Sequence, residues 1–145
     1  MEVDILGIQE LNVCWRKVGE QHRIWDRFRN WKEICQLSAA YNTRDINSVK
    51  YQPGGTAIVT INKLAHRVID HGGDSSNLGR WVWTRYQGSF NRKFVVFSVY
   101  RPIDCKGKKG YNSAYEQQLC YSMKYNGGRC PRELLLEDLS EELIK

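Results

Sequence analysis

The sequence has 145 residues, of which 41% are hydrophobic and 12% aromatic, enough to form a folded core and to exclude an intrinsically disordered chain. It has no low-complexity stretch and no apolar run near the roughly 20 residues that a membrane-spanning helix needs. Acidic Glu2 and Asp4 stand where a signal peptide carries positive charge. We therefore expect a soluble, intracellular protein with no membrane partner, the nucleus being one candidate compartment. The oligomeric state is not indicated.

The five cysteines give neither a zinc motif nor a disulfide framework. Their number is odd, and no two of them are closer than ten positions. Reduced thiols are the favoured interpretation.

The net charge of +6 is concentrated in one stretch. Residues 80–109 contain eight basic residues and one acid, a net of +7, whereas residues 131–145 carry a net of −3. A basic stretch of this kind suits a polyphosphate partner such as nucleic acid. Basic residues between aromatics on strands are also common on a solvated surface, so charge alone leaves both interpretations open.

The first elements expected along the chain are a strand and a helix. Residues 3–8 are nearly all apolar and predict a strand buried on both faces, which ends at Gln9 and Glu10. Residues 18–37 predict an amphipathic helix, because four of their apolar residues are spaced by four, three and four positions: Ile24, Phe28, Trp31 and Cys35.

A series of strands follows a polar region at 42–50. Gly54 and Gly55 precede a β-branched strand at 56–61, and Val68 and Ile69 begin a third strand that residues 71–73 are expected to break. Residues 80–86 place Trp81 and Trp83 on one face and Val82 and Thr84 on the other. With the β-prone residues 93–100 and a link at 87–91, they predict a hairpin.

Two helices close the sequence after a basic loop at 106–110. Ser113 and Glu116 form a capping box that opens a helix to about Tyr125, which Gly127 and Gly128 end. Pro131 suits the first position of a last helix, in which leucines recur every four residues: Leu135, Leu139 and Leu143. The element order predicts an α/β architecture with an antiparallel component.

Glu10 is the sharpest candidate for chemistry. A carboxylate just beyond a buried strand is held at the rim of a sheet, where ligands bind, and Mg²⁺ or Mn²⁺ prefers carboxylate oxygens and water. An acid in this position is also common at the start of a helix. Tyr100 ends the hairpin, and it is either a half-buried core aromatic or a phenol that binds a phosphate.

These segments together resemble the endonuclease/exonuclease/phosphatase superfamily. The run DILGIQE resembles its strand ending in Gln-Glu, Gly54 and Gly55 resemble its Gly-Gly before a strand, and VVFSVYRP resembles its strand ending in Tyr-x-Pro. The phrases NLGRWVW, SAYEQQ and CPRELLLEDL resemble the endonuclease-like domains found with reverse transcriptases in retrotransposons.

The resemblance implies a four-layer α/β sandwich that hydrolyses phosphodiester or phosphomonoester bonds with a metal-activated water. Glu10 would bind Mg²⁺ or Mn²⁺ and Tyr100 would orient the phosphate. The partner would be nucleic acid, with DNA favoured over RNA. The residues expected to contact it are the following: Asn12, Arg80, Arg101, Lys106, Lys108 and Lys109.

The sequence also departs from that family. It lacks the asparagine-bearing first strand, the Gly-Asp-x-Asn motif and the final Ser-Asp-His. Gly73, Asp74 and Asn77 have the wrong spacing for the second of these, and we interpret them as a polar turn. The histidines all precede Tyr100, so none of them suits the final motif: His22, His66 and His71.

We therefore expect residues 1–145 to form a single incomplete domain of a nuclease that does not cleave nucleic acid by itself. The main alternative is a non-catalytic remnant that binds nucleic acid. A phosphoinositide or sphingolipid head group as substrate and a purely structural module are further alternatives; for the lipid, no apolar membrane-docking loop is visible.

Overall fold

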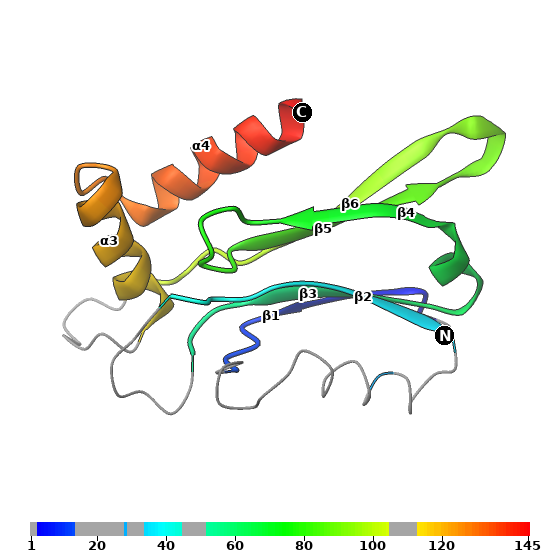
Figure 1. Cartoon of the computed structure of the whole chain (residues 1–145), viewed down its shortest axis with the longest axis horizontal. Coiled ribbons are helices and arrows are strands. Elements are labelled where there is room, and N and C mark those ends of the chain that lie inside the picture. Colours follow the sequence, from blue (N-terminus) through cyan, green and yellow to red (C-terminus); the bar gives the residue numbers. More distant parts are fainter. Residues whose placement is uncertain (1–2, 14–27, 29–33, 45–51, 105–112) are drawn as a thin grey trace. The chain divides into compact units, whose positions relative to one another are not determined.

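The computed structural model describes residues 3–13, 28, 34–44, 52–104 and 113–145 (Figure 1). Their contacts divide into two compact units. The sandwich unit comprises the described residues up to Tyr100, and the helical unit comprises those from Arg101 onward. The elements are β1 (Ile5–Gln9), β2 (Cys35–Ala40), β3 (Thr56–Ile61), β4 (Val68–Gly73), β5 (Trp81–Gln87), β6 (Lys93–Val99), α3 (Ala114–Tyr125) and α4 (Pro131–Ile144), with short 3₁₀ helices at Asn62–Arg67 and Ser89–Asn91.

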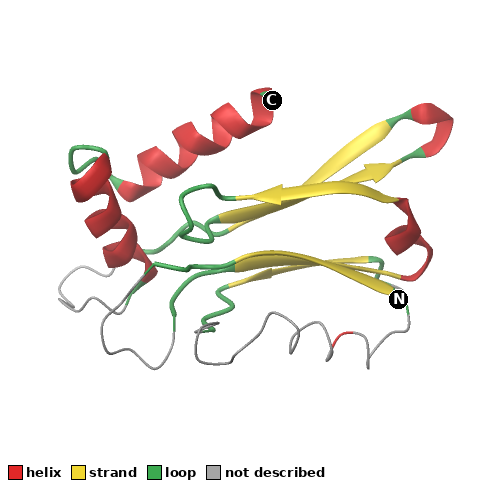
Figure 2. Cartoon of the chain, viewed as in Figure 1, coloured by secondary structure: helices red, strands yellow, loops and turns green. Residues whose placement is uncertain are grey.

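The sandwich unit consists of two antiparallel three-stranded sheets, one with the order β1-β3-β2 and the other β4-β5-β6 (Figure 2). The sheets pack face to face, since β3 contacts β5 and β6 while β2 contacts β4 and β5. The expected combination of helices with antiparallel strands is confirmed.

The interface between the two sheets is unusually rich in hydroxyl groups. The Thr60 hydroxyl lies 2.7 Å from the Tyr86 hydroxyl, and the Thr84 hydroxyl donates to Ser38 at 2.9 Å. All four side chains are buried, so each hydroxyl needs a partner, and these pairs supply one across the sheets. The hydrogen bonds fix how the sheets face one another more specifically than apolar contact alone.

Strand β3 is buried on both faces, as expected of a central strand. Thr60 faces the other sheet, whereas Val59 and Ile61 form a buried cluster with Cys35 on the opposite face. Phe28, which is helical, packs against this cluster. The apolar, β-branched sequence of β3 suits this double burial.

Strand β1 differs from the prediction. Among the described strands it pairs only with β3, at the edge of its sheet, and Leu6 is exposed, so the expectation of a strand buried on both faces was wrong. The helix predicted for residues 18–37 also ended too late, because Cys35 and Leu37 belong to β2. Pairing with β3 decides the conformation of this weakly β-prone stretch. Residues 18–27 and 29–33 of the predicted helix lie outside the described residues.

Strand β4 continues through the glycines that were expected to break it. Gly72 pairs with Trp83, and a Cβ atom at Gly72 would lie 2.6 Å from the Trp83 ring. A glycine is therefore needed at position 72, because any side chain there would occupy the space of the Trp83 indole. The β5–β6 hairpin and the two faces predicted for Trp81–Thr84 are confirmed.

The helical unit contains the two predicted helices. Ser113 accepts a hydrogen bond from the Glu116 N–H at 3.2 Å, which confirms the N-cap, and Pro131 begins α4. The buried Ser122 hydroxyl of α3 donates to the Arg129 carbonyl at 2.7 Å. Of the predicted leucine stripe, Leu135 is buried, whereas Leu143 is exposed.

Among the described residues, no helix combines the length and apolar character needed to cross a membrane.

Candidate functional site

Glu10 and Tyr100, the two residues expected to carry the chemistry, lie together in the sandwich unit. Glu10 follows β1, Tyr100 follows β6, and the Tyr100 hydroxyl donates to Glu10 Oε1 at 2.5 Å. Ninety positions separate them in the sequence. The two strands belong to different sheets, so the face-to-face packing of the sheets is what brings this carboxylate and phenol together.

The loop after β1 holds Glu10 in an unusual backbone conformation. Glu10 has φ 53° and Asn12 has φ 50°, both in the left-handed region. This region costs a residue with a long side chain about 1–2 kcal/mol. Backbone strain of this kind is frequent at functional sites, because the surrounding structure must hold it in place.

Two glycines hold that loop. The Leu11 and Asn12 N–H groups donate to the carbonyls of Gly55 and Gly54 at 3.2 and 3.0 Å, and the Gly54 N–H donates to Asn12 Oδ1 at 3.1 Å. Asn12 was expected to contact nucleic acid. Its side-chain oxygen stabilises the loop that carries Glu10, and the contact with nucleic acid stays a prediction.

Gln9 and Ser98 join the two sheets beside the site. Gln9 Nε2 donates to the Val99 carbonyl at 2.7 Å, one residue before Tyr100, and the Ser98 hydroxyl donates to the Ile8 carbonyl at 3.3 Å. The glutamine of the Gln-Glu pair therefore has a positioning role that the sequence did not reveal, because its partner is a backbone carbonyl of a distant strand.

Arg80 does not behave as the predicted nucleic-acid contact. Its side chain is 2% exposed, and its Nε and Nη2 donate to the two carboxylate oxygens of Asp74 at 2.9 Å each. Its guanidinium also lies over the Trp81 ring, 4.5 Å from the centroid. A buried guanidinium that is paired in this way has a structural role and is not accessible to a ligand.

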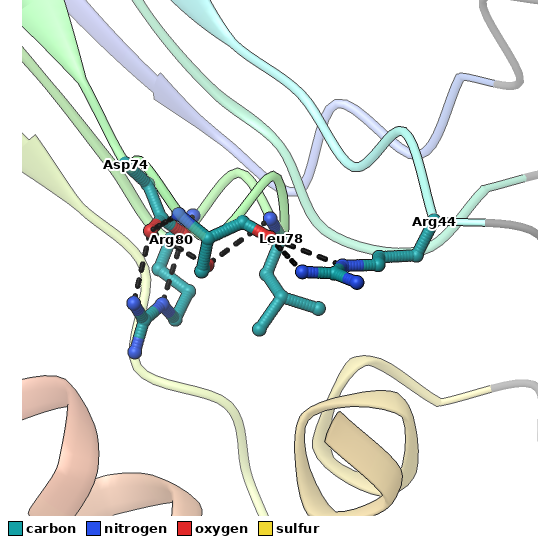
Figure 3. Close-up of polar contacts among 5 residues, drawn as sticks. Arg44, Asp74, Leu78 and Arg80 are labelled. Carbon is teal, nitrogen blue, oxygen red and sulfur yellow. Dashed lines mark hydrogen bonds and ion pairs between the residues drawn. The ribbon is translucent and has the colours of Figure 1, made fainter. Parts of the chain in front are cut away.

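Asp74 is the centre of the polar turn that was expected at 73–77. Its Oδ1 accepts from the Ser76 N–H and hydroxyl, and its Oδ2 accepts from the Arg80 N–H. Figure 3 shows Arg44 approaching the same turn, where its Nε and Nη2 donate to the Ser76 carbonyl at 3.1 and 2.8 Å. The side chains of Asp74 and Arg44 therefore both stabilise this turn.

The charge state of Asp74 follows from these contacts. Burial by itself would raise the pKa of Asp74, but hydrogen bonds from Arg80, its positive charge and hydrogen bonds from Ser76 outweigh burial and hold the pKa below its ordinary value. The carboxylate is therefore charged at neutral pH, which leaves the buried guanidinium paired.

This buried pair is connected to Tyr100 through the backbone. The Tyr100 N–H donates to the carbonyl of Arg80 at 2.7 Å, and Arg80 is the residue that donates three hydrogen bonds to Asp74. Asp74, Arg80, Tyr100 and Glu10 thus form a continuous chain of hydrogen bonds. We infer that the buried pair positions Tyr100.

The other basic candidates differ in position. Arg101 is exposed and directly follows Tyr100, so its guanidinium is accessible to a phosphate. Lys106, Lys108 and Lys109 lie outside the described residues. Arg85, a further member of the basic stretch, has Asp70 at 3.9 Å.

Among the described residues, Glu10 is the one carboxylate of this site that could bind a metal ion. Glu10 is exposed, and within the part of the chain that the structure describes its Oε2 has no hydrogen-bond donor. The described residues contain no group of three metal-ligating carboxylates, histidines or cysteines. One carboxylate with water suits Mg²⁺ or Mn²⁺ only when a phosphate completes the coordination.

Comparison of the chain with family models, with curated proteins and with solved structures found no match. The functional conclusion therefore depends on the residues of this chain.

Proposed function

We propose that the chain is part of a metal-dependent phosphodiesterase domain of the endonuclease type, a four-layer α/β sandwich in its complete form, that acts on nucleic acid. The observation that carries the proposal is the 2.5 Å hydrogen bond between Tyr100 and Glu10. The resemblance assigns these two residues to one site from two motifs that lie ninety positions apart, and their hydrogen bond supports that assignment.

Glu10 would bind Mg²⁺ or Mn²⁺, and the metal would supply Lewis-acid stabilisation of charge on the phosphate. Tyr100 would fix the orientation of the carboxylate, as outer-shell partners do for metal ligands, and would present its phenol to the phosphate. Arg101 and the lysines at 106, 108 and 109 would contact the nucleic-acid backbone independently of sequence, with DNA favoured over RNA.

The chain by itself would not cleave its substrate. The described residues supply one candidate metal carboxylate, and the sequence contains neither Gly-Asp-x-Asn nor Ser-Asp-His. Phosphodiester hydrolysis also needs groups that activate the water and assist the leaving oxygen. The lack of these two motifs in the sequence favours the second candidate function, a non-catalytic module that binds nucleic acid.

A Mn²⁺ titration followed by electron paramagnetic resonance, with inorganic phosphate present, tests the metal site. We expect Glu10→Gln to weaken Mn²⁺ binding at least about tenfold, as loss of a ligand should exceed the usual cost of losing an outer-shell partner. Glu141→Gln is the matched control, because Glu141 is exposed and the charge change is the same. Equal Mn²⁺ affinity of the two variants would contradict the proposal.

Plasmid nicking tests whether the chain cleaves nucleic acid by itself. The wild-type chain with Mg²⁺ is expected to leave supercoiled plasmid intact while binding it in a salt-dependent manner. Replacing each of the lysines at 106, 108 and 109 by alanine should lower the salt slope by about one. Magnesium-dependent nicking that disappears in Glu10→Gln would show that the chain is an active nuclease alone.

A further inference from the structure

The tip of the β5–β6 hairpin, residues 88–92, presents an aromatic side chain to solvent. Phe90 is 95% exposed, the largest exposed fraction among the large hydrophobic residues described. Strand β4 pairs with β5 only as far as Tyr86, so the hairpin extends beyond its neighbour strand (Figure 1). The tip lies before β6 and Tyr100 after it, so seven strand residues, roughly 23 Å, separate the tip from the candidate metal site.

The tip holds Phe90 in this position. The Gly88 N–H donates to the Arg92 carbonyl at 2.7 Å, and the Arg92 N–H donates to the Ser89 carbonyl at 3.1 Å. Below the tip, Tyr86 and Phe94 stack with ring centroids 4.9 Å apart. The exposed Phe90 ring therefore belongs to a hydrogen-bonded turn, and the stacked Tyr86 and Phe94 rings follow directly in the hairpin.

The conformation of Phe90 is unfavourable in two respects. Its φ of 54° lies in the left-handed region, which costs a bulky residue about 1–2 kcal/mol, and its ring gains no burial in return. A glycine or an asparagine would adopt this positive φ at a lower cost in free energy. A local choice that opposes stability without a packing benefit points to a binding role.

The surroundings of Phe90 indicate the kind of partner. Between residues 87 and 93 there are two cations, Arg92 and Lys93, and no acid, and both cations are exposed. Ser89 and Asn91 flank Phe90, which is the single aromatic residue of the tip; the 42% exposed Phe94 lies outside the tip and is stacked on Tyr86. A membrane-inserting tip needs a wider apolar surface, and phenylalanine has no donor for reading base edges in a duplex.

We propose that the hairpin tip is a second nucleic-acid contact, at which Phe90 stacks on an unpaired base while Arg92 and Lys93 bind the adjacent phosphates. Aromatic stacking beside a positive backbone track is the usual means of binding single strands without sequence preference. The inference rests on the nucleic-acid partner of the proposed function, but it uses a separate site and needs no metal.

Fluorescence anisotropy with labelled oligothymidine and a blunt duplex of equal length, in EDTA and at fixed salt, tests the inference. Phe90→Ala is expected to weaken oligothymidine binding roughly tenfold, with less than about a twofold change for the duplex, and Phe90→Trp should retain binding. Ile144→Ala, at an apolar residue that is 86% exposed, is the matched control and should bind like wild type. In a separate salt series, Arg92→Ala and Lys93→Ala should each reduce the salt slope of oligothymidine binding by about 0.7.

Three outcomes would overturn the inference. They are failure of the wild-type chain to bind oligothymidine, unchanged binding by Phe90→Ala, and an equal loss on single strand and duplex. Phe90-dependent binding to phosphatidylserine vesicles with unchanged oligothymidine binding would assign the tip to a membrane surface instead. Because EDTA removes the metal, loss of Mn²⁺ binding and loss of oligothymidine binding are independent results.

Discussion

At one end of β6, Tyr100 is held by the Arg80 carbonyl and donates to Glu10, and the buried Asp74–Arg80 pair supports both. At the other end of the same strand, Phe90 projects into solvent from a turn closed by backbone hydrogen bonds. Both ends contain residues with positive φ, Glu10 and Phe90. Similar backbone strain therefore accompanies two different arrangements: the Glu10 carboxylate accepts a hydrogen bond from Tyr100, whereas the Phe90 ring is exposed to solvent.

The largest effect is expected from the buried ion pair. Asp74→Asn leaves the Arg80 guanidinium without its carboxylate and should lower the free energy of unfolding by about 3–5 kcal/mol. The control is Asp70→Asn, which removes the half-exposed partner of Arg85 at 3.9 Å and should cost less than about 1 kcal/mol. Urea denaturation measures both. Equal costs would show that the pair does not anchor the Tyr100 end.

Low pH should reduce the stability that the Asp74–Arg80 pair contributes. The pKa of Asp74 is lower in the folded chain than its ordinary value of 3.8, so the folded state binds fewer protons there. The stabilisation is complete above the unfolded pKa and is lost as the pH falls through the folded pKa. Urea midpoints measured down to about pH 3 should therefore decline more steeply for wild type than for Asp74→Asn. Parallel curves would contradict this account.

A smaller effect is expected at the loop that carries Glu10. Asn12→Ala removes the hydrogen bond to the Gly54 N–H and places alanine at a φ of 50°, which together should cost about 1–2 kcal/mol. Asn12→Gly loses the same hydrogen bond but tolerates the conformation, so thermal unfolding should show a smaller loss. If glycine is as damaging as alanine, the backbone conformation is not the cause.

Tyr100→Phe should have a still smaller effect on stability. It removes one hydrogen bond to a carboxylate that is exposed to water, worth about 1 kcal/mol, and leaves the ring in place. Chemical denaturation measures the change. A loss as large as that of Asp74→Asn would mean that the phenol supports the fold more than the site.

The smallest effect on stability is expected at the hairpin tip. Phe90→Ala removes an unburied ring and should change the free energy of unfolding by less than about 0.5 kcal/mol. A cost above about 1 kcal/mol by thermal denaturation would show that the ring is packed, and the contrast between the two ends of β6 would fail.

Much of the fold could be predicted from local patterns. The alternation of β5, the β-branched run of β3 and the Ser113 cap are properties of short segments, and each is found in the structure. Strand β2 was not predictable in this way, because helical periodicity covers its first residues and pairing with β3 determines its conformation. Gly72 was expected to break β4, because the Trp83 ring that occupies the space beside it belongs to another strand and is not apparent from the local sequence.

The candidate site was predictable only in part. Glu10 and Tyr100 could be named from the sequence, but the 2.5 Å contact between them depends on tertiary packing. Counting charges between residues 80 and 109 misjudged Arg80, because its carboxylate partner, Asp74, lies just before that stretch. Burial and pairing decide whether a basic residue faces a ligand, and neither is visible in composition.

We propose that Glu10 and Tyr100 act as one site for a metal and its phosphate. The decisive experiment is a double-mutant cycle on Mn²⁺ affinity in the presence of inorganic phosphate, with Glu10→Gln, Tyr100→Phe and the double variant. We predict that Tyr100→Phe weakens binding in the wild-type background and has almost no further effect once Glu10 is glutamine. Equal effects of Tyr100→Phe in both backgrounds would show that the two residues act independently and would contradict the account.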